Sequence, residues 1–149
     1  MRCVIQRVSR AKVSIDGEIT GEISRGILIL LGVAREDSFT DADYLLAKTI
    51  NLRIFEDEQD KMNLSLLDIK GGLLVVSQFT LYGDARKGRR PSFIEAATPE
   101  KALELYEYFI SEARKHLSKV ATGRFQAMMN VELVNDGPIT ILLDSSKTF

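Results

Sequence analysis

The chain has 149 residues, of which 20 are basic and 21 acidic, and 45% of its residues are hydrophobic. This size and composition predict a single domain over residues 1–149, and the net charge of -1 excludes a general attraction to nucleic acid. One His, one Cys and no Trp leave almost no means of building a Ser-His-Asp triad or a His/Cys metal cluster, so we expect no metal and no cofactor.

The N-terminal residues 1–8 are rich in Val and Ile and predict a strand. They lack the long apolar core and the cleavage site of a signal peptide. The longest apolar run, 27–34, is too short to cross a bilayer, so no membrane association is expected. The single cysteine, Cys3, cannot form an internal disulfide, which suits a reducing compartment. These features predict a cytoplasmic protein.

The next residues predict further strands and one helix. Residues 11–15 continue the strand pattern, and Asp16-Gly17 is typical of a two-residue hairpin turn, because both residues tolerate positive φ. The continuous apolar run over residues 26–33 predicts a strand buried on both faces. A helix is expected to begin at Thr40, whose hydroxyl would cap the free amides.

The second half of the chain completes an α+β pattern. Residues 73–76 predict another buried strand, and a second helix is expected with Thr98 as N-cap and Pro99 in its first position. Residues 128–134 and 139–143 predict two strands joined by a turn. Because strands far outnumber helices, we expect a largely antiparallel, barrel-like sheet flanked by two main helices.

The strand at 73–76 leads into an uncharged polar segment that begins Ser77-Gln78-Phe79-Thr80. If the strand continues, its alternation puts Gln78 and Thr80 on one face and Ser77 and Phe79 on the other. Gln78 and Thr80 would then face a substrate, with backbone amides available to stabilise an oxyanion. The alternative is a strand end whose polar groups have only a structural role.

Thr80 has no evident general base. The only imidazole, His116, falls late in the second predicted helix, where a surface position is expected. If the chain is an enzyme, either the substrate supplies a catalytic group or a positioned water attacks.

A second polar segment, Asn135-Asp136-Gly137-Pro138, lies between the last two predicted strands. The plain interpretation is a turn that connects a hairpin. The functional interpretation is a rigid wedge, because Gly137 permits close backbone approach and Pro138 stiffens it. Such a wedge could reject one hand of a chiral substrate on steric grounds.

Four cations occur within five residues after the first polar segment. They are Arg86, Lys87, Arg89 and Arg90. The stretch predicts either a solvated loop or a loop that contacts phosphate groups beside the site.

Five stretches in a fixed order carry a resemblance to a known family. They are residues 1–8, 77–84, 89–93, 123–129 and 135–140. On these stretches the chain closely resembles the D-aminoacyl-tRNA deacylases of the bacterial and eukaryotic type, along its full length. The resemblance implies a homodimeric hydrolase that cleaves the ester between a D-amino acid and the 3′ end of tRNA. It implies catalysis without metal, helped by the terminal 2′-hydroxyl of the tRNA.

The resemblance also implies roles for particular residues. The 3′-terminal adenosine and the ester would be received by Ser77, Gln78, Phe79 and Thr80, with Met129 lining the pocket. The Gly-Pro bond would be cis and would enter the site of the partner subunit, where it excludes L-aminoacyl groups. The residues that match this element are Gly137 and Pro138, with Arg7 matching the arginine that orients it.

Two departures from the family pattern are visible. Ile139 stands where valine is common, and Gln126 stands where glycine is often found, which puts the pocket wall in question. We expect broad tolerance among D-amino acids and acceptance of glycine. Two other classes remain open: a noncatalytic tRNA- or RNA-binding module, and a small-acyl hydrolase with Thr80 as nucleophile.

Overall fold

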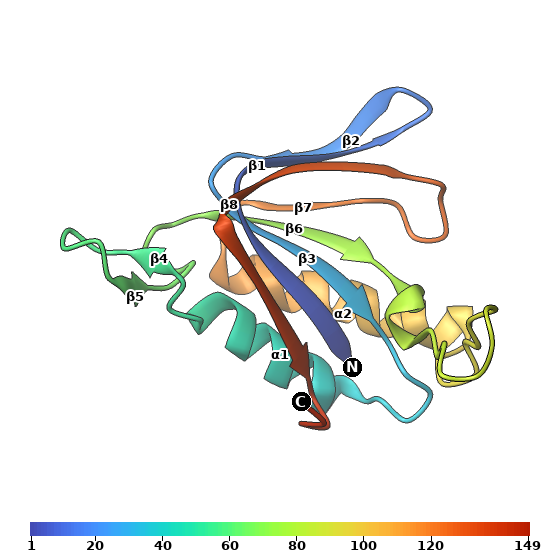
Figure 1. Ribbon diagram of the computed structural model, residues 1–149. Coiled ribbons are helices and arrows are strands. Elements are labelled where there is room, and N and C mark those ends of the chain that lie inside the picture. The colour runs from blue at the N-terminus through green and yellow to red at the C-terminus, as the bar shows by residue number, and fades with distance from the viewer.

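The computed structural model describes residues 1–149 as a curved sheet with two helices side by side on one face (Figure 1). The helices are α1 (Phe39–Asn51) and α2 (Pro99–His116), and a short 3-10 helix is η1 (Phe79–Tyr82). The strands are β1 (Arg2–Ile15), β2 (Glu18–Ile23), β3 (Gly26–Gly32), β4 (Phe55–Glu56), β5 (Met62–Leu64), β6 (Gly72–Ser77), β7 (Val120–Thr122) and β8 (Asn130–Asp144). Neither α-helix is long and apolar enough to span a membrane.

Strand β1 is the centre of the main sheet, whose order is β2-β1-β3-β6-β7, with β8 also paired to β1. β1 runs antiparallel to β2, β3 and β8, whereas β3–β6 and β6–β7 are parallel pairs. Parallel neighbours need a crossover connection, and α1 and α2 lie in the two connections concerned. The predicted α+β class with two helices and a barrel-like sheet is confirmed, and the parallel pairs make the sheet mixed.

The sheet curls until β2 and β7 nearly meet. A Cβ atom on Gly21 in β2 would lie 2.4 Å from the carbonyl oxygen of Thr122 in β7, which is too close for any side chain. Gly21 therefore permits the close approach that almost closes the barrel.

Strands β3 and β6 are buried on both faces, as their apolar runs predict. In β3, Ile27 and Ile29 pack on the helix side, while Leu28 packs on the opposite side, inside the curled sheet. β6 alternates in the same way. The helix-side core is completed by α1 and α2, whose buried residues include Leu45 and Phe109.

The first helix begins at Phe39, and Ser38 caps it instead of the predicted Thr40. Ser38 has extended backbone angles, and the Asp41 carboxylate accepts hydrogen bonds of 2.8 Å from both its amide and its hydroxyl. A serine with an acidic residue three positions later is the capping-box arrangement, which prevails over a lone threonine. The predicted positions of Thr98 and Pro99 at the start of α2 are confirmed.

The last two predicted strands form one continuous strand, β8, so the predicted hairpin between them is wrong. Both halves of β8 pair with β1 in the same antiparallel direction, and the chain does not reverse. The pairs that flank the irregularity are Gln6–Thr140 and Val8–Asn135. Four residues of β8, 136 to 139, therefore lie opposite the single residue Arg7 and bulge from the sheet. We call residues 136–139 the Gly-Pro loop.

Candidate active site

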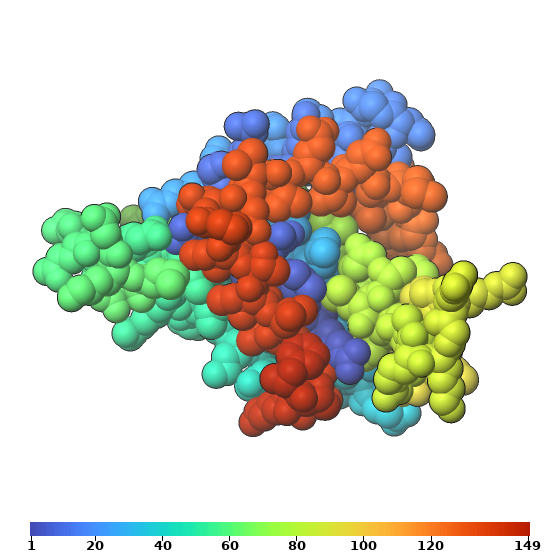
Figure 2. Space-filling model, viewed as in Figure 1, coloured from blue at the N-terminus to red at the C-terminus, as the bar shows by residue number.

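A cavity of about 710 Å³ lies at the end of β6, and we call it the β6 cavity. One wall is the chain from β6 into η1, and the other is the segment before β8. In Figure 2 these walls belong to the yellow-green and orange segments that adjoin on the visible face. Six residues singled out in the sequence line this cavity: Ser77, Gln78, Phe79, Thr80, Gln126 and Met129.

The polar segment at the cavity is a tight turn and does not continue the strand. β6 ends at Ser77 and η1 begins at Phe79, and all four residues from Ser77 to Thr80 line one cavity, so the predicted sorting of alternate side chains onto two faces is wrong. Gln78 and Thr80 still lie together, with the Gln78 amide nitrogen donating a hydrogen bond to the Thr80 hydroxyl oxygen. The first amides of a 3-10 helix, here those of Phe79 and Thr80, have no acceptor within the helix. The Thr80 hydroxyl and two such amides are thus gathered at the cavity wall.

None of the residues that line the β6 cavity is ionisable. His116 is exposed in the last turn of α2, as predicted, and does not line the cavity. A Thr80 nucleophile would therefore have no base within the cavity. No three His, Cys, Asp or Glu side chains lie together in a way that would hold a metal ion. The arrangement can orient an ester and donate hydrogen bonds to it.

The wall opposite η1 includes a residue in an unusual conformation. Gln126 has φ +61°, in the left-handed region that glycine adopts most easily. The turn is closed by a hydrogen bond of 3.2 Å from the Ala127 amide to the Arg124 carbonyl. The glycine that the family resemblance implies at position 126 would fit this backbone, and Gln126 places a side chain at this wall.

Other walls of the cavity were not predicted from the sequence. Leu31 lies at the end of β3 and Val33 directly follows that strand, whereas Pro99 and Ala102 come from the start of α2. No local pattern marks these residues. The signal that would identify them is the parallel pairing of β3 and β6, which brings the ends of both strands to one edge of the sheet.

Gly137 and Pro138 do not line the β6 cavity of their own chain, and both are exposed. The peptide bond between them is cis, and Gly137 has φ +127°. A Cβ atom on Gly137 would lie 2.9 Å from Cγ1 of Ile139. Asn135 fixes the far end of the loop, because its Oδ1 accepts a hydrogen bond of 2.9 Å from the Ile139 amide and its Nδ2 donates one of 3.0 Å to the Thr140 hydroxyl.

Arg7 lies beneath the Gly-Pro loop with 4% of its surface exposed. Its Nε donates to the Asp136 carbonyl at 3.0 Å and lies 3.3 Å from the Asp136 carboxylate. Its Nη1 donates to the Ile54 carbonyl at 2.7 Å and to Glu56 Oε1 at 2.9 Å. The hydrogen bond from Arg7 lowers the pKa of Glu56 below its ordinary value. The loop is therefore joined through Arg7 to β4.

The basic stretch leaves η1 as an exposed loop outside the β6 cavity. Arg86 is paired with Asp84, whose carboxylate oxygens lie 2.9 Å from its Nε and 2.7 Å from its Nη2. The hydrogen bond from Arg86 lowers the pKa of Asp84 to about 2. The three cations of the stretch that form no salt bridge within the chain are Lys87, Arg89 and Arg90.

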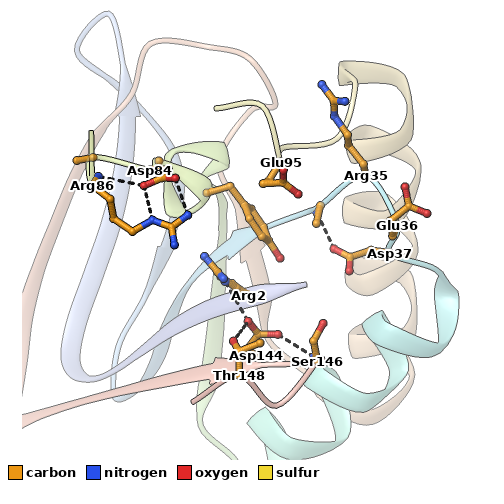
Figure 3. Close-up of a pocket in the computed structure, with 14 residues that line it drawn as sticks. Arg2, Arg35, Glu36, Asp37, Asp84, Arg86, Glu95, Asp144, Ser146 and Thr148 are labelled. Carbon is orange, nitrogen blue, oxygen red and sulfur yellow. Dashed lines mark hydrogen bonds and ion pairs between the residues drawn. The ribbon is translucent and has the colours of Figure 1, made fainter. Parts of the chain in front are cut away.

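A second cavity, of about 790 Å³, borders the segment that follows η1 (Figure 3). Its lining holds five carboxylates and three guanidinium groups, most of them already paired, as the dashed lines for Arg86–Asp84 and Arg2–Asp144 show (Figure 3). Burial alone would raise the pKa of Asp144, but hydrogen bonds from Thr148, Arg2 and Ser146 lower it. The excess of carboxylates makes this cavity a poor candidate for binding phosphate groups.

The sequence matches the family described as D-Tyr-tRNA(Tyr) deacylase over residues 4–144. It is 62% identical to the D-aminoacyl-tRNA deacylases of Koribacter versatilis and of Clostridioides difficile, over 149 residues and 100% of each chain. A solved structure described as c-Myc DNA Unwinding Element Binding Protein has a TM-score of 0.92 and 41% identity, covering 97% of this chain and 98% of that one. Another, described as a probable eukaryotic D-amino acid tRNA deacylase, has a TM-score of 0.82 at 16% identity, covers 95% and 97% of the two chains, and shows the fold alone.

The fold, the uncharged cavity and the relatives together define an ester hydrolase. The chain belongs to the D-Tyr-tRNA(Tyr) deacylase family, and the resemblance drawn from the five sequence stretches is confirmed.

The left-handed backbone at position 126 generates a prediction about stability. Gln126→Gly should leave the free energy of unfolding unchanged or raise it by up to about 1 kcal/mol, because glycine adopts this φ without strain. Gln126→Val should lower it by about 1–2 kcal/mol, because a β-branched side chain is strained there. Urea denaturation of the three proteins measures both effects. A valine variant as stable as the glycine variant would contradict the prediction.

Proposed function

We propose that the protein hydrolyses the ester that joins a D-amino acid to the 3′ end of tRNA, releasing free D-amino acid and tRNA. The observation that carries the proposal is the β6 cavity, which gathers Ser77, Gln78, Phe79, Thr80 and Met129 in a chain of this family. The cytoplasm, where charged tRNA is used, is the proposed location.

In the proposed reaction the protein positions the ester and stabilises the developing oxyanion. The amides of Phe79 and Thr80 are the proposed donors, and the Thr80 hydroxyl positions the ester beside Gln78. The terminal 2′-hydroxyl of the tRNA orients or activates the attacking water. This division of roles is supported by the absence of ionisable groups from the cavity lining.

Selectivity in the proposal comes from a homodimer in which the Gly-Pro loop of each copy enters the β6 cavity of the other. Two observations support this arrangement: Gly137 and Pro138 are exposed, and they stay out of the cavity of their own chain. A rigid backbone beside the ester would clash with an L side chain and leave a D side chain unhindered. Glycyl-tRNA, which presents only hydrogens, would be accepted.

The test is hydrolysis of D-tyrosyl-tRNA and L-tyrosyl-tRNA by the purified protein, side by side, in the presence of a metal chelator. We expect rapid loss of the D-ester alone. Loss of both esters would support the proposed ester hydrolysis but contradict the proposed rejection of L-aminoacyl groups by the Gly-Pro loop. Retention of both esters by folded, dimeric protein would favour a noncatalytic tRNA-binding module or a metal requirement.

The proposed filter predicts the effect of changing Pro138. Pro138→Ala should raise kcat/KM for L-tyrosyl-tRNA about tenfold or more, because the loop loses the ring that fixes its backbone. The free energy of unfolding should change by only about 0.5 kcal/mol, because Pro138 is exposed. Steady-state kinetics with both esters and urea denaturation provide the two measurements. Pro91→Ala, at another exposed proline, is the control and should leave the D/L ratio unchanged.

The exposed basic loop predicts the salt dependence of tRNA binding. Replacing Arg89 and Arg90 with alanine should weaken binding and reduce the slope of log Kd against log salt by about 0.7 for each phosphate that the loop no longer neutralises. Arg86→Ala should have a smaller effect, because Arg86 is paired with Asp84. Binding of uncharged tRNA at several salt concentrations measures the slopes. Equal slopes for the wild type and the Arg89/Arg90 variant would remove these residues from the interface.

A further inference from the structure

Arg7 joins two parts of the chain that are far apart in sequence. On one side its Nε binds the Asp136 carbonyl at the base of the Gly-Pro loop, at 3.0 Å. On the other side its Nη1 binds the Ile54 carbonyl and Glu56 Oε1, at 2.7 and 2.9 Å. The remaining nitrogen, Nη2, forms no hydrogen bond within the chain and lies 3.2 Å from the position that a Cβ atom on Gly137 would occupy.

We propose that Glu56 is a positioning residue for substrate selectivity, acting on the Gly-Pro loop through the guanidinium of Arg7. The inference rests on the proposed function, since it assigns to Glu56 a part in the rejection of L-aminoacyl esters.

The charge balance around Arg7 supports this role. A cation with only 4% of its surface exposed requires anions and hydrogen-bond acceptors close by. Two carboxylates provide them, and Glu56 is the nearer: its oxygen lies 2.9 Å from Arg7, compared with 3.3 Å for the Asp136 carboxylate. Without the charge of Glu56, Arg7 would have only one salt bridge left, the one to the Asp136 carboxylate in the Gly-Pro loop.

The placement of Glu56 is itself fixed. It ends β4, directly after Ile54 and Phe55, which are 5% and 0% exposed, so the backbone on its N-terminal side is anchored in the core. On the other side, Asp57 closes the turn to β5, accepting hydrogen bonds of 2.8 Å from the Gln59 amide and 2.7 Å from the Asn63 side chain. Because the backbone is fixed on both sides of Glu56, its carboxylate can keep Arg7 in one orientation.

The orientation of Arg7 determines the space beside Gly137. The guanidinium is planar, so fixing Nη1 at β4 and Nε at Asp136 also fixes Nη2 next to the Gly137 backbone. Rotation of Arg7 toward Asp136 would shift Nη2 and release the loop from its support. The loop would then exclude an L side chain less well.

The test compares Glu56→Gln with Glu58→Gln, which removes a carboxylate from the exposed turn between the antiparallel strands β4 and β5. Glu56→Gln should raise the L/D ratio of kcat/KM values for tyrosyl-tRNA about tenfold, as expected for the loss of one charge-assisted hydrogen bond. Glu58→Gln should leave the ratio at the wild-type value. An unchanged ratio in Glu56→Gln would overturn the proposal.

A double variant separates action through Arg7 from a general loss of structure. If Glu56 acts through Arg7, the double variant Arg7→Lys/Glu56→Gln should have the same L/D ratio of kcat/KM as Arg7→Lys alone. An L/D ratio in the double variant equal to the product of the two single effects would contradict the proposal. The backbone amide signal of Gly137 in NMR spectra provides a readout besides activity. It should shift in Glu56→Gln and not in Glu58→Gln; no shift would contradict the contact. Failure of the wild type to hydrolyse D-tyrosyl-tRNA would instead contradict the proposed function, and the NMR result would still test the link to the loop.

Discussion

Strand β1 is the constraint on which the remaining structure depends, because partners occupy both of its edges along most of its length. β2 and β3 pair with one edge and β8 with the other. In β1, alternation puts Cys3 and Ile5 against the helix-side core and Val8 inside the curled sheet. The irregularity in pairing between Val8 and Arg10 then changes the parity, so Val13 also lies inside the curled sheet. A shift of one residue in its register would reverse every side chain. Arg7 is buried opposite the Gly-Pro loop only because this register is held on both sides.

The two parts of the proposed site are built in opposite ways. The β6 cavity has no ionisable lining; its walls carry hydroxyls, amides and apolar side chains. The exposed residues of the Gly-Pro loop, Gly137 and Pro138, carry no charge. Beneath them the loop is bound by the buried guanidinium of Arg7, which is paired with Glu56 and Asp136. In the proposed mechanism, the protein positions the ester at the end of β6 and rejects L side chains with the backbone of a loop in β8, so the two tasks would fall on different strands.

Much of the fold could be predicted, because its signals are local. The Asp16-Gly17 turn and the apolar runs of β3 and β6 carry their structure within a few residues, and the structure confirms them. The path from Ser77 to Tyr82 could not be predicted, because its side chains fit a strand equally well and the 3-10 turn depends on tertiary packing. Asn135-Asp136-Gly137-Pro138 has the composition of a hairpin turn. The residues on both sides of this segment pair with the same strand, β1. Only this pairing shows that the chain bulges there and does not reverse.

The site was predictable only in part, for a related reason. Ser77 to Thr80 and Met129 belong to contiguous motifs, and the structure brings them together in the β6 cavity. The walls from β3 and α2, and the contact of Glu56 with Arg7, join residues that are distant in sequence. No spacing rule connects such residues before the strand order is known.

None of the residues that line the β6 cavity titrates, so the rate of the proposed reaction would not depend on the protonation state of a side chain in the cavity. In enzymes with a catalytic histidine or carboxyl group, activity declines where that group gains or loses its proton. Here the titrating groups nearest the reaction would belong to the substrate, chiefly the α-amino group of the aminoacyl ester, whose class titrates at about pH 7.7–8.0 when free. The pH optimum would then be a property of the aminoacyl ester and would change with the amino acid that it carries.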